Sequence, residues 1–100
     1  MTMMKRNRKY TVRVSKRYRR ELKAVLLRGK DESKLEEVID ILASGEKLPP
    51  RYKDHTLSGQ WKGYRECHIE PNWLLVYRIY DDVLVLALMS TGTHSDIFGM

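Results

Sequence analysis

Three histidines are the residues of this chain best suited to proton transfer. They stand at His55, His68 and His94, each within or at the end of a predicted strand and each with polar neighbours. Imidazole is the side chain that gains and loses a proton near neutral pH. A solitary histidine is usually an ordinary surface residue, and the spacings of 13 and 26 residues match no metal-ligand motif. Zinc binding by three histidines stays open as an alternative.

RNA cleavage is the reaction that such a set fits best. RNA carries its own nucleophile, the 2′-hydroxyl, so an enzyme needs only a base, an acid and positive charge on the phosphate between them. This mechanism requires no metal or other cofactor. The candidates to hold the phosphate are Arg65 and Arg78. The candidates to stack on a base are the aromatic residues Trp61, Tyr64, Trp73 and Phe98, each of which also has an ordinary place in a hydrophobic core.

Length and composition indicate one domain over residues 1–100. The single cysteine, Cys67, lies in a predicted strand and is interpreted as a core residue. It rules out an internal disulfide framework and a cysteine-based zinc site. The N-terminus "MTMMKRNRKY" is basic but has no apolar segment behind it, so no signal peptide is expected. With no stretch of membrane-spanning length, we expect a soluble, cytoplasmic protein with no membrane partner.

Positive charge is concentrated at the start of the chain. Residues 1–30 hold 12 of the 19 Lys and Arg residues and one of the 13 acidic residues. Such a distribution is typical of a surface that meets a polyanion, although a basic helix face can also be merely solvated. The residues expected to contact ribosomal RNA are Arg17, Arg19, Arg20 and Lys23.

Periodicity predicts an α+β fold. A strand over 9–14 precedes a helix over 16–29, capped by Ser15, and a second helix over 31–45, where Ser33 and Glu36 have capping-box spacing. The two helices should form an antiparallel hairpin. Strands follow near 55–57 and over 64–70, 73–80 and 83–89, with turns at 71–72 and 81–82. The N-terminal strand and the helical hairpin would thus pack on a small, mainly antiparallel sheet.

Two features of this sheet bear on the histidines. The last strand is apolar throughout, which predicts a central strand covered on both faces. A strict two-residue turn at 71–72 would set His68 opposite Leu75, on the face of Tyr77 and Leu86. A bulge would reverse that facing, and the sequence leaves both arrangements open.

The second half of the chain resembles a known family. Residues 48–99 contain "YKDHTLSGQWKGYRECHIEPNWLLVYRI" and "TGTHSDIFG", and these motifs look like the YafQ branch of the RelE superfamily of bacterial type II toxins. The resemblance implies a RelE-like fold and a ribosome-dependent endoribonuclease that enters the ribosomal A site and cuts messenger RNA. It also implies a cognate acidic antitoxin, encoded beside the toxin, and binding of the pair to its own operator DNA.

The same resemblance suggests roles for individual residues. His55, His68 and His94 match the catalytic histidines, and Phe98 matches a residue that contacts the substrate. The further site residues expected from the matching motifs are Asn72 for catalysis and Lys53, Arg65 and Trp73 for substrate binding.

Two positions depart from the family pattern. Asn72 stands where the family often has an acid, and an asparagine cannot act as a base. Ser90 stands where a basic residue commonly precedes T-G-T-H. These departures keep open a second reading, a non-catalytic RNA- or ribosome-binding protein of the same fold. A DNA-binding module is disfavoured because the sequence has no helix-turn-helix signal.

Overall fold

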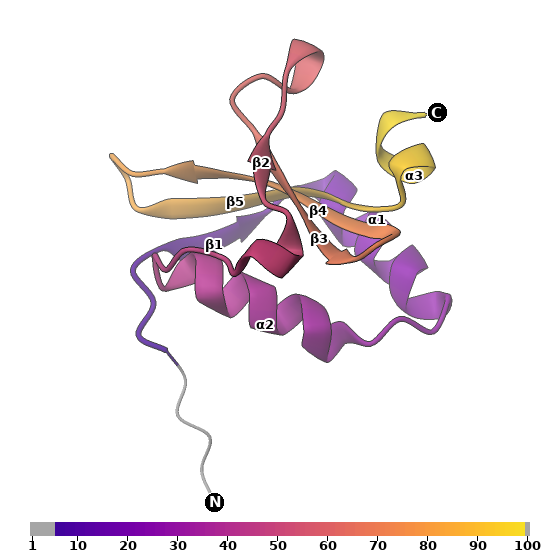
Figure 1. The fold of residues 1–100 in the computed structure, drawn as a ribbon, viewed down its shortest axis with the longest axis horizontal. Coiled ribbons are helices and arrows are strands. Elements are labelled where there is room, and N and C mark those ends of the chain that lie inside the picture. Colours follow the sequence, from indigo (N-terminus) through magenta and orange to yellow (C-terminus); the bar gives the residue numbers. More distant parts are fainter. Residues whose placement is uncertain (1–5, 100) are drawn as a thin grey trace, which may run out of the picture.

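A five-stranded mixed sheet with helices on both faces forms the structure, a computed structural model that describes residues 6–99 (Figure 1). The elements follow the chain as β1 (Thr11–Val14), α1 (Lys16–Leu27), α2 (Glu32–Ala43), the 3₁₀ turn η1 (Pro50–Tyr52), β2 (His55–Thr56), the 3₁₀ turn η2 (Gly59–Trp61), β3 (Arg65–Glu70), β4 (Trp73–Tyr80), β5 (Val85–Gly92) and α3 (His94–Phe98). The strand order is β1-β5-β4-β3-β2, and only the β1–β5 pair is parallel. The predicted α+β class is confirmed.

The basic segment from which we expected no signal peptide begins with residues 1–5, which lie outside the described residues. Within the described part of the chain, no helix is long and apolar enough to cross a membrane.

The two long helices cover one face of the sheet. The Ser15 side chain caps α1 by accepting from the Tyr18 backbone N–H. Asp31 caps α2, so the predicted capping box at Ser33 is wrong. The reason is local: the Asp31 carboxylate accepts both the backbone N–H and the hydroxyl of Ser33, at 3.0 and 2.7 Å. Ser33 is therefore a donor inside the first turn rather than the cap itself.

Apolar stripes on these helices build the main core. Tyr18 and Val25 of α1 are buried at the helical spacing of seven residues, against Leu86 and Leu88 of β5. The α2 stripe packs on the same face of the sheet and contributes Leu35, Val38, Ile41 and Leu42. From β4, alternate residues point into this core: Trp73, Leu75 and Tyr77.

Two strand boundaries differ from the prediction. Strand β1 starts at Thr11 rather than residue 9, because the backbone N–H groups of Lys9 and Tyr10 both donate to the Ala43 carbonyl, at 2.8 and 2.9 Å. Strand β5 runs from 85 to 92 rather than from 83 to 89, because a four-residue turn, with Leu84 at φ +53°, replaces the predicted Asp81-Asp82 turn. The central strand is β4, and β5 lies between β1 and β4.

A β-bulge decides which way His68 faces. Glu70 pairs with Trp73 across the predicted turn at 71–72, but His68 pairs with Leu74, so Ile69 is the extra residue. One inserted residue turns the strand to the other face. His68 therefore shares a face with Leu74, away from the helices, and the arrangement opposite Leu75 does not occur.

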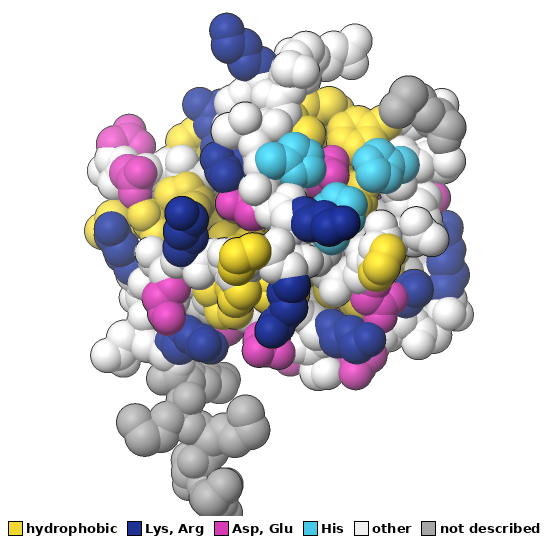
Figure 2. All heavy atoms as spheres, in the orientation of Figure 1, with side chains coloured by type: hydrophobic (Ala, Val, Ile, Leu, Met, Phe, Trp, Pro, Cys, Tyr) yellow, Lys and Arg dark blue, Asp and Glu magenta, His cyan; other side chains and the backbone are white. Residues whose placement is uncertain are grey.

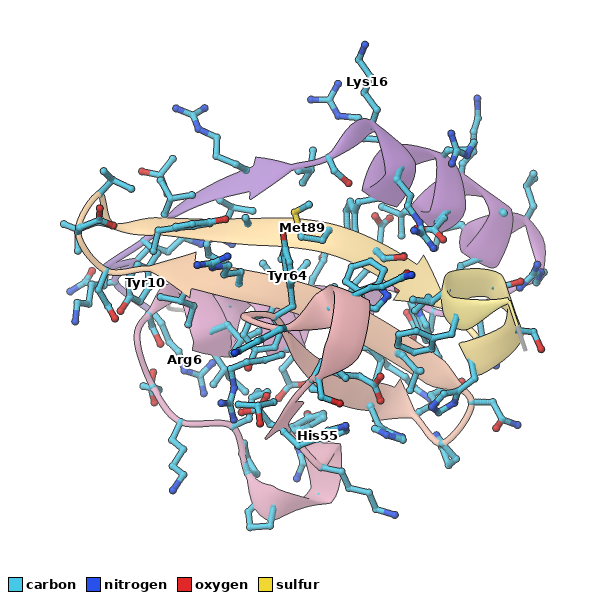
Figure 3. The ribbon with its side chains drawn as sticks, turned by 90° about the horizontal axis from the view of Figure 1, so that it is seen from above. Arg6, Tyr10, Lys16, His55, Tyr64 and Met89 are labelled. Carbon is cyan, nitrogen blue, oxygen red and sulfur yellow. The ribbon has the colours of Figure 1, made fainter. Side chains whose placement is uncertain are left out.

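Few hydrophobic residues pack on this second face of the sheet. Its small core consists of Leu74, Val76 and Ile97, against which lie the partly buried side chains of Leu57, Trp61, Tyr64, Met89 and Phe98. They come from the β2–β3 segment, from β5 and from the short helix α3. Seen from above, Tyr64 and Met89 lie over the sheet on this side (Figure 3). The face thus leaves room at the sheet's end for polar side chains.

Replacing Gly92 by alanine should destabilise the fold where β5 turns into α3. Gly92 has φ +145°, and a Cβ there would lie 2.8 Å from Asp96 Oδ2, so strain and a steric clash add together. We expect Gly92→Ala to lower the free energy of unfolding by about 2–3 kcal/mol in urea titrations. Gly59→Ala is the matched control, since Gly59 also has positive φ but faces open space. Equal losses in both variants would contradict the predicted clash.

Candidate active site

Three histidines from three elements converge on one carboxylate. Glu66 Oε1 lies 3.6 Å from Nε2 of His55, 3.5 Å from Nε2 of His68 and 3.9 Å from Nε2 of His94. His68 is in the middle, with its ring centroid 6.3 Å from each of the other two. All three gather on one face of the molecule, with Lys and Arg side chains beside them (Figure 2). We call these four residues the histidine cluster.

Glu66 and the three histidines differ in their exposure to water. The Glu66 side chain is 3% exposed, whereas those of His55, His68 and His94 are 49%, 20% and 54% exposed. The carboxylate is thus shielded from water, whereas the imidazoles are partly or largely exposed to water. A buried negative charge is costly unless positive charge or hydrogen-bond donors face it. Glu66 can therefore stabilise an imidazolium that forms when one of these rings takes up a proton.

Backbone contacts fix the ring of His55. Its Nδ1 lies 2.8 Å from the carbonyl oxygen of Lys53, and a carbonyl can only accept, so Nδ1 carries a proton. Any further proton exchange of this ring then takes place at Nε2, the atom that faces Glu66. Lys53 adopts φ +50° where η1 ends, and this turn of the chain brings its carbonyl back to the ring. Lys53 thus contributes its backbone carbonyl to the position of the His55 ring.

The short helix α3 carries His94 and Phe98 together. Their ring centroids are 5.7 Å apart, so the predicted substrate contact lies beside a histidine of the cluster. A capping box starts the helix, with Thr93 accepting from the Asp96 N–H and Asp96 accepting from the Thr93 N–H. The five-residue helix buries Ile97, and further contacts hold it against α1.

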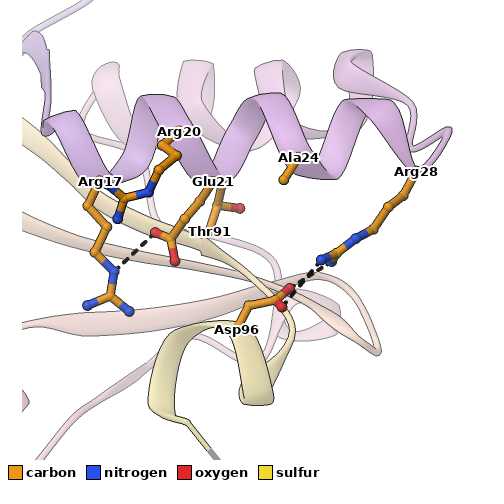
Figure 4. Close-up of a pocket in the computed structure, with 7 residues that line it drawn as sticks. All are labelled: Arg17, Arg20, Glu21, Ala24, Arg28, Thr91 and Asp96. Carbon is orange, nitrogen blue, oxygen red and sulfur yellow. Dashed lines mark hydrogen bonds and ion pairs between the residues drawn. The ribbon is translucent and has the colours of Figure 1, made fainter.

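These contacts come from one face of α1 (Figure 4). Arg17, Glu21, Ala24 and Arg28 recur at helical spacing and line a groove between α1 and α3. Arg28 donates to both carboxylate oxygens of Asp96, at 2.7 and 3.4 Å, and Arg17 donates to the Ile97 carbonyl at 2.7 Å. The Arg28 guanidinium, together with the Thr93 N–H, lowers the pKa of Asp96 to about 2. Two arginines of α1 therefore hold α3 in place.

Two hollows flank the histidine cluster. One is lined by His68 and by the cationic residues Lys34, Arg51 and Lys53, among others. The other is lined by Arg17, Gln60, Trp61, Tyr64, Ile97 and Phe98, and Phe98 joins it to His94. Positive charge and aromatic rings thus lie on either side of the histidine cluster.

Several predicted site residues lie elsewhere. Arg65 points to the opposite face of β3, where the Asp54 carboxylate binds it at 2.8 Å and raises the pKa of the guanidinium. Trp73 is 1% exposed and donates from Nε1 to Thr91 Oγ1, so no ring face is free for a base. Asn72 is exposed in the β3–β4 turn and forms no hydrogen bond with the histidines in the described structure. The other candidate cation, Arg78, stacks between Tyr64 and Tyr80.

The four basic residues of α1 that were expected to contact ribosomal RNA fall into two groups. Arg17 and Arg20 line the groove facing α3, whereas Arg19 and Lys23 are exposed and line neither that groove nor the two hollows. Ser90, the position expected to be basic, is fully buried and donates its hydroxyl to Glu21. Glu21 also pairs with Arg17 at 3.3 Å. Arg17 thus places a positive charge near Ser90, the position in β5 where a basic residue was expected.

Sequence reasoning missed Glu66, the residue at the centre of the cluster. The sequence does indicate that Glu66 lies near His68, since the two are two residues apart in a strand and so share a face. The sequence does not indicate that Glu66 lies near His55, because that contact depends on the pairing of β2 with β3. Cys67 is fully buried, as expected, and burial raises the pKa of its thiol. Within residues 6–99, no group of three His, Cys, Asp or Glu side chains is arranged to hold a metal ion.

Comparison with known proteins assigns the family. Residues 10–99 match the family model described as a bacterial toxin of type II toxin–antitoxin systems, YafQ. The chain belongs to the YafQ toxin family. It is 40% identical over 89 residues to the mRNA interferase toxin YafQ of Escherichia coli K12, covering 88% of this chain and 95% of that protein.

Solved structures of similar toxins share the fold. One is the E. coli DinJ–YafQ toxin–antitoxin complex, with a TM-score of 0.83 and 39% identity over 91% of this chain and 99% of that one. Another is a metal-bound toxin from Helicobacter pylori, with a TM-score of 0.84 and 40% identity over 89% of this chain and 99% of that one. The α+β fold of this chain is therefore the fold of solved YafQ structures.

The Arg28–Asp96 ion pair should make stability depend on acid pH. Folding lowers the pKa of Asp96 to about 2 from 3.8, so its contribution is complete above about pH 4 and is lost as pH falls toward 2. We expect Asp96→Asn to lower the free energy of unfolding by about 1 kcal/mol at pH 7, with the difference from the unmodified protein vanishing near pH 2. Urea unfolding at several pH values measures this. Asp82→Asn, in an exposed turn, is the control, and a difference independent of pH would exclude the ion pair as its source.

Proposed function

We propose that this chain is an endoribonuclease toxin that cleaves messenger RNA on the ribosome by metal-independent acid–base catalysis. One observation carries the proposal: three imidazoles, two exposed and one partly buried, present Nε2 within 3.5–3.9 Å of the same buried carboxylate. The relative from E. coli is named an mRNA interferase toxin, which supports the same substrate for this chain. The protein would act where ribosomes are, in the cytoplasm.

The reaction needs two proton transfers on opposite sides of one phosphate. A base takes the proton of the 2′-hydroxyl, and the oxygen attacks phosphorus. The bond from phosphorus to the 5′-oxygen breaks, an acid gives that oxygen a proton, and a cyclic phosphate remains on the other fragment. Attack and departure take place in line, so the base and the acid must flank the phosphate.

The order of the rings suggests which histidine does what. His55 and His94 are the outer pair around His68, so they fit the flanking base and acid. His68, the least exposed of the three, fits a contact to the phosphate between them. Glu66 would stabilise the positive charge that the base gains and the acid starts with. Lys53 would add charge beside the phosphate from the neighbouring hollow.

The departure at Asn72 weighs little against catalysis. Asn72 forms no hydrogen bond with the histidine cluster in the described structure, so an amide at that position removes no proton carrier from it. The position of Asn72 therefore favours a catalytic protein over a non-catalytic RNA- or ribosome-binding protein.

The family and the charge together indicate the macromolecular partners of this chain. An E. coli relative is solved as a complex with DinJ, and we infer an acidic antitoxin for this chain, with operator DNA bound by the pair. Arg19 and Lys23, exposed on α1 and outside the described grooves, fit contacts to ribosomal RNA phosphates. Arg20 would extend this surface toward α3.

Removing the His94 imidazole tests the proposed catalysis. We expect His94→Ala and His94→Gln to slow messenger cleavage by roughly a hundredfold or more, because neither residue can shuttle a proton near neutral pH. Primer extension on ribosome-bound messenger measures cleavage, and growth arrest on induction reports toxicity. Thermal unfolding should be little changed, since His94 is exposed. Full toxicity of both variants at equal protein level would remove His94 from the mechanism.

Neutralising Glu66 should separate activity from stability. Glu66→Gln keeps the side-chain shape but removes a buried charge, so we expect unfolding stability to be unchanged or higher. Cleavage should fall at least about tenfold, because an amide cannot stabilise an imidazolium as a carboxylate does. Glu70→Gln is the matched control in the same strand, where Lys30 and Lys34 bind the carboxylate. Cleavage as fast as in the control would show that the Glu66 charge has no catalytic part.

A further inference from the structure

The hollow beside Phe98 contains an aromatic set that the proton-transfer chemistry does not use. Trp61 lies at its centre, with its ring centroid 5.5 Å from Tyr64 and 6.0 Å from Phe98, and both rings stand nearly perpendicular to it. Interplanar angles of 81° and 84° are typical of edge-to-face packing. These rings are only partly buried, and the hollow they line is open, with a volume of about 520 Å³.

Arg17 completes this hollow from α1. Its guanidinium lies 5.4 Å from the Trp61 ring centroid, a cation–π contact. Glu21 and the Ile97 carbonyl hold it in place, at 3.3 and 2.7 Å. A guanidinium has five N–H donors, so hydrogen-bonding capacity remains for a ligand. Arg17 is thus a fixed charge at the wall of an aromatic hollow.

The position of the hollow identifies its ligand. Phe98 is shared between this hollow and His94, whose ring centroid is 5.7 Å away, so a ligand here adjoins the phosphate under attack. Proteins bind single-stranded nucleic acid by combining aromatic stacking platforms with positive charge that follows the backbone. From Arg17 the surface continues into the groove that Arg20 also lines (Figure 4), and these two arginines supply that charge.

We propose that Arg17, Trp61, Tyr64 and Phe98 form a nucleobase pocket for the nucleotide next to the cleaved phosphate of single-stranded RNA. The base stacks on the exposed part of the Trp61 and Phe98 rings, and Arg17 donates to the base or to its phosphate. This inference rests on the proposed RNA cleavage for its biological meaning, but the pocket itself is tested by binding alone.

Quenching of tryptophan fluorescence measures whether a base stacks in this pocket. The protein has two tryptophans; Trp73 is 1% exposed inside the helix-side core, so a stacked base can quench only Trp61. The probe is a single-stranded DNA hexanucleotide, which lacks the 2′-hydroxyl and cannot be cleaved. The comparison ligand is an abasic hexanucleotide with the same phosphates. We expect the first to quench fluorescence and the second to bind about tenfold more weakly without quenching.

Variants assign the effect to residues. Trp61→Phe should abolish the quenching while Trp73 still reports a folded core, and Arg17→Met should weaken binding about tenfold. Arg6→Met is the matched control, since Arg6 forms an exposed ion pair with Glu46 far from this hollow. Quenching that persists in Trp61→Phe, equal binding of the abasic ligand, or no quenching by the DNA hexanucleotide at millimolar concentration would each overturn the pocket.

The outcome is separable from that of the proposed activity. If the unmodified protein cleaves messenger but shows no base-dependent quenching, the pocket is wrong and the nuclease function stands. If quenching follows the expected pattern but His94 variants keep full toxicity, the pocket stands and the assigned catalysis falls.

Discussion

A negative charge buried beneath three imidazoles is the constraint on which the site depends. Glu66 is nearly inaccessible to water, and the groups facing its Oε1 include Nε2 of all three histidines. A carboxylate in such surroundings is costly to folding. Its presence makes physical sense if positive charge forms above it during function, because the same low polarity that makes it costly strengthens its attraction for an imidazolium.

The scaffold devotes one face of the sheet to packing and the other to this site. Helices α1 and α2 bury their stripes on the face that carries Trp73, Leu75 and Tyr77, which supplies most of the core. The opposite face has only a small core, built from Leu74, Val76 and Ile97. Polar and aromatic side chains can therefore stand exposed there, on strands that the other face keeps rigid.

The short helix α3 shows how a chain end is held accurately. Five residues cannot form a stable helix alone, and α3 gains its position from a capping box and from two arginines of α1. Arg17 and Arg28 are eleven residues apart, three helical turns, so they lie on one face of α1 and reach opposite ends of the groove. The basic helix is thus both a charged surface and the support for His94 and Phe98.

Local sequence determined much of this protein. The order of the five strands and the two long helices, the α1 cap at Ser15 and the histidines as candidates for proton transfer follow from patterns within a few residues, since propensity, periodicity and side-chain chemistry are short-range properties. The short helix α3 was not predicted, because its five residues are held in a helix by contacts with α1 as well as by their own capping box. Only the tertiary structure decided the rest. The bulge at Ile69 turned His68 to the open face, strand pairing brought His55 opposite Glu66, and packing buried Trp73 while leaving Trp61 partly exposed. These outcomes depend on which strands pair and in what register, and a shift of a single residue reverses the facing of every side chain in a strand.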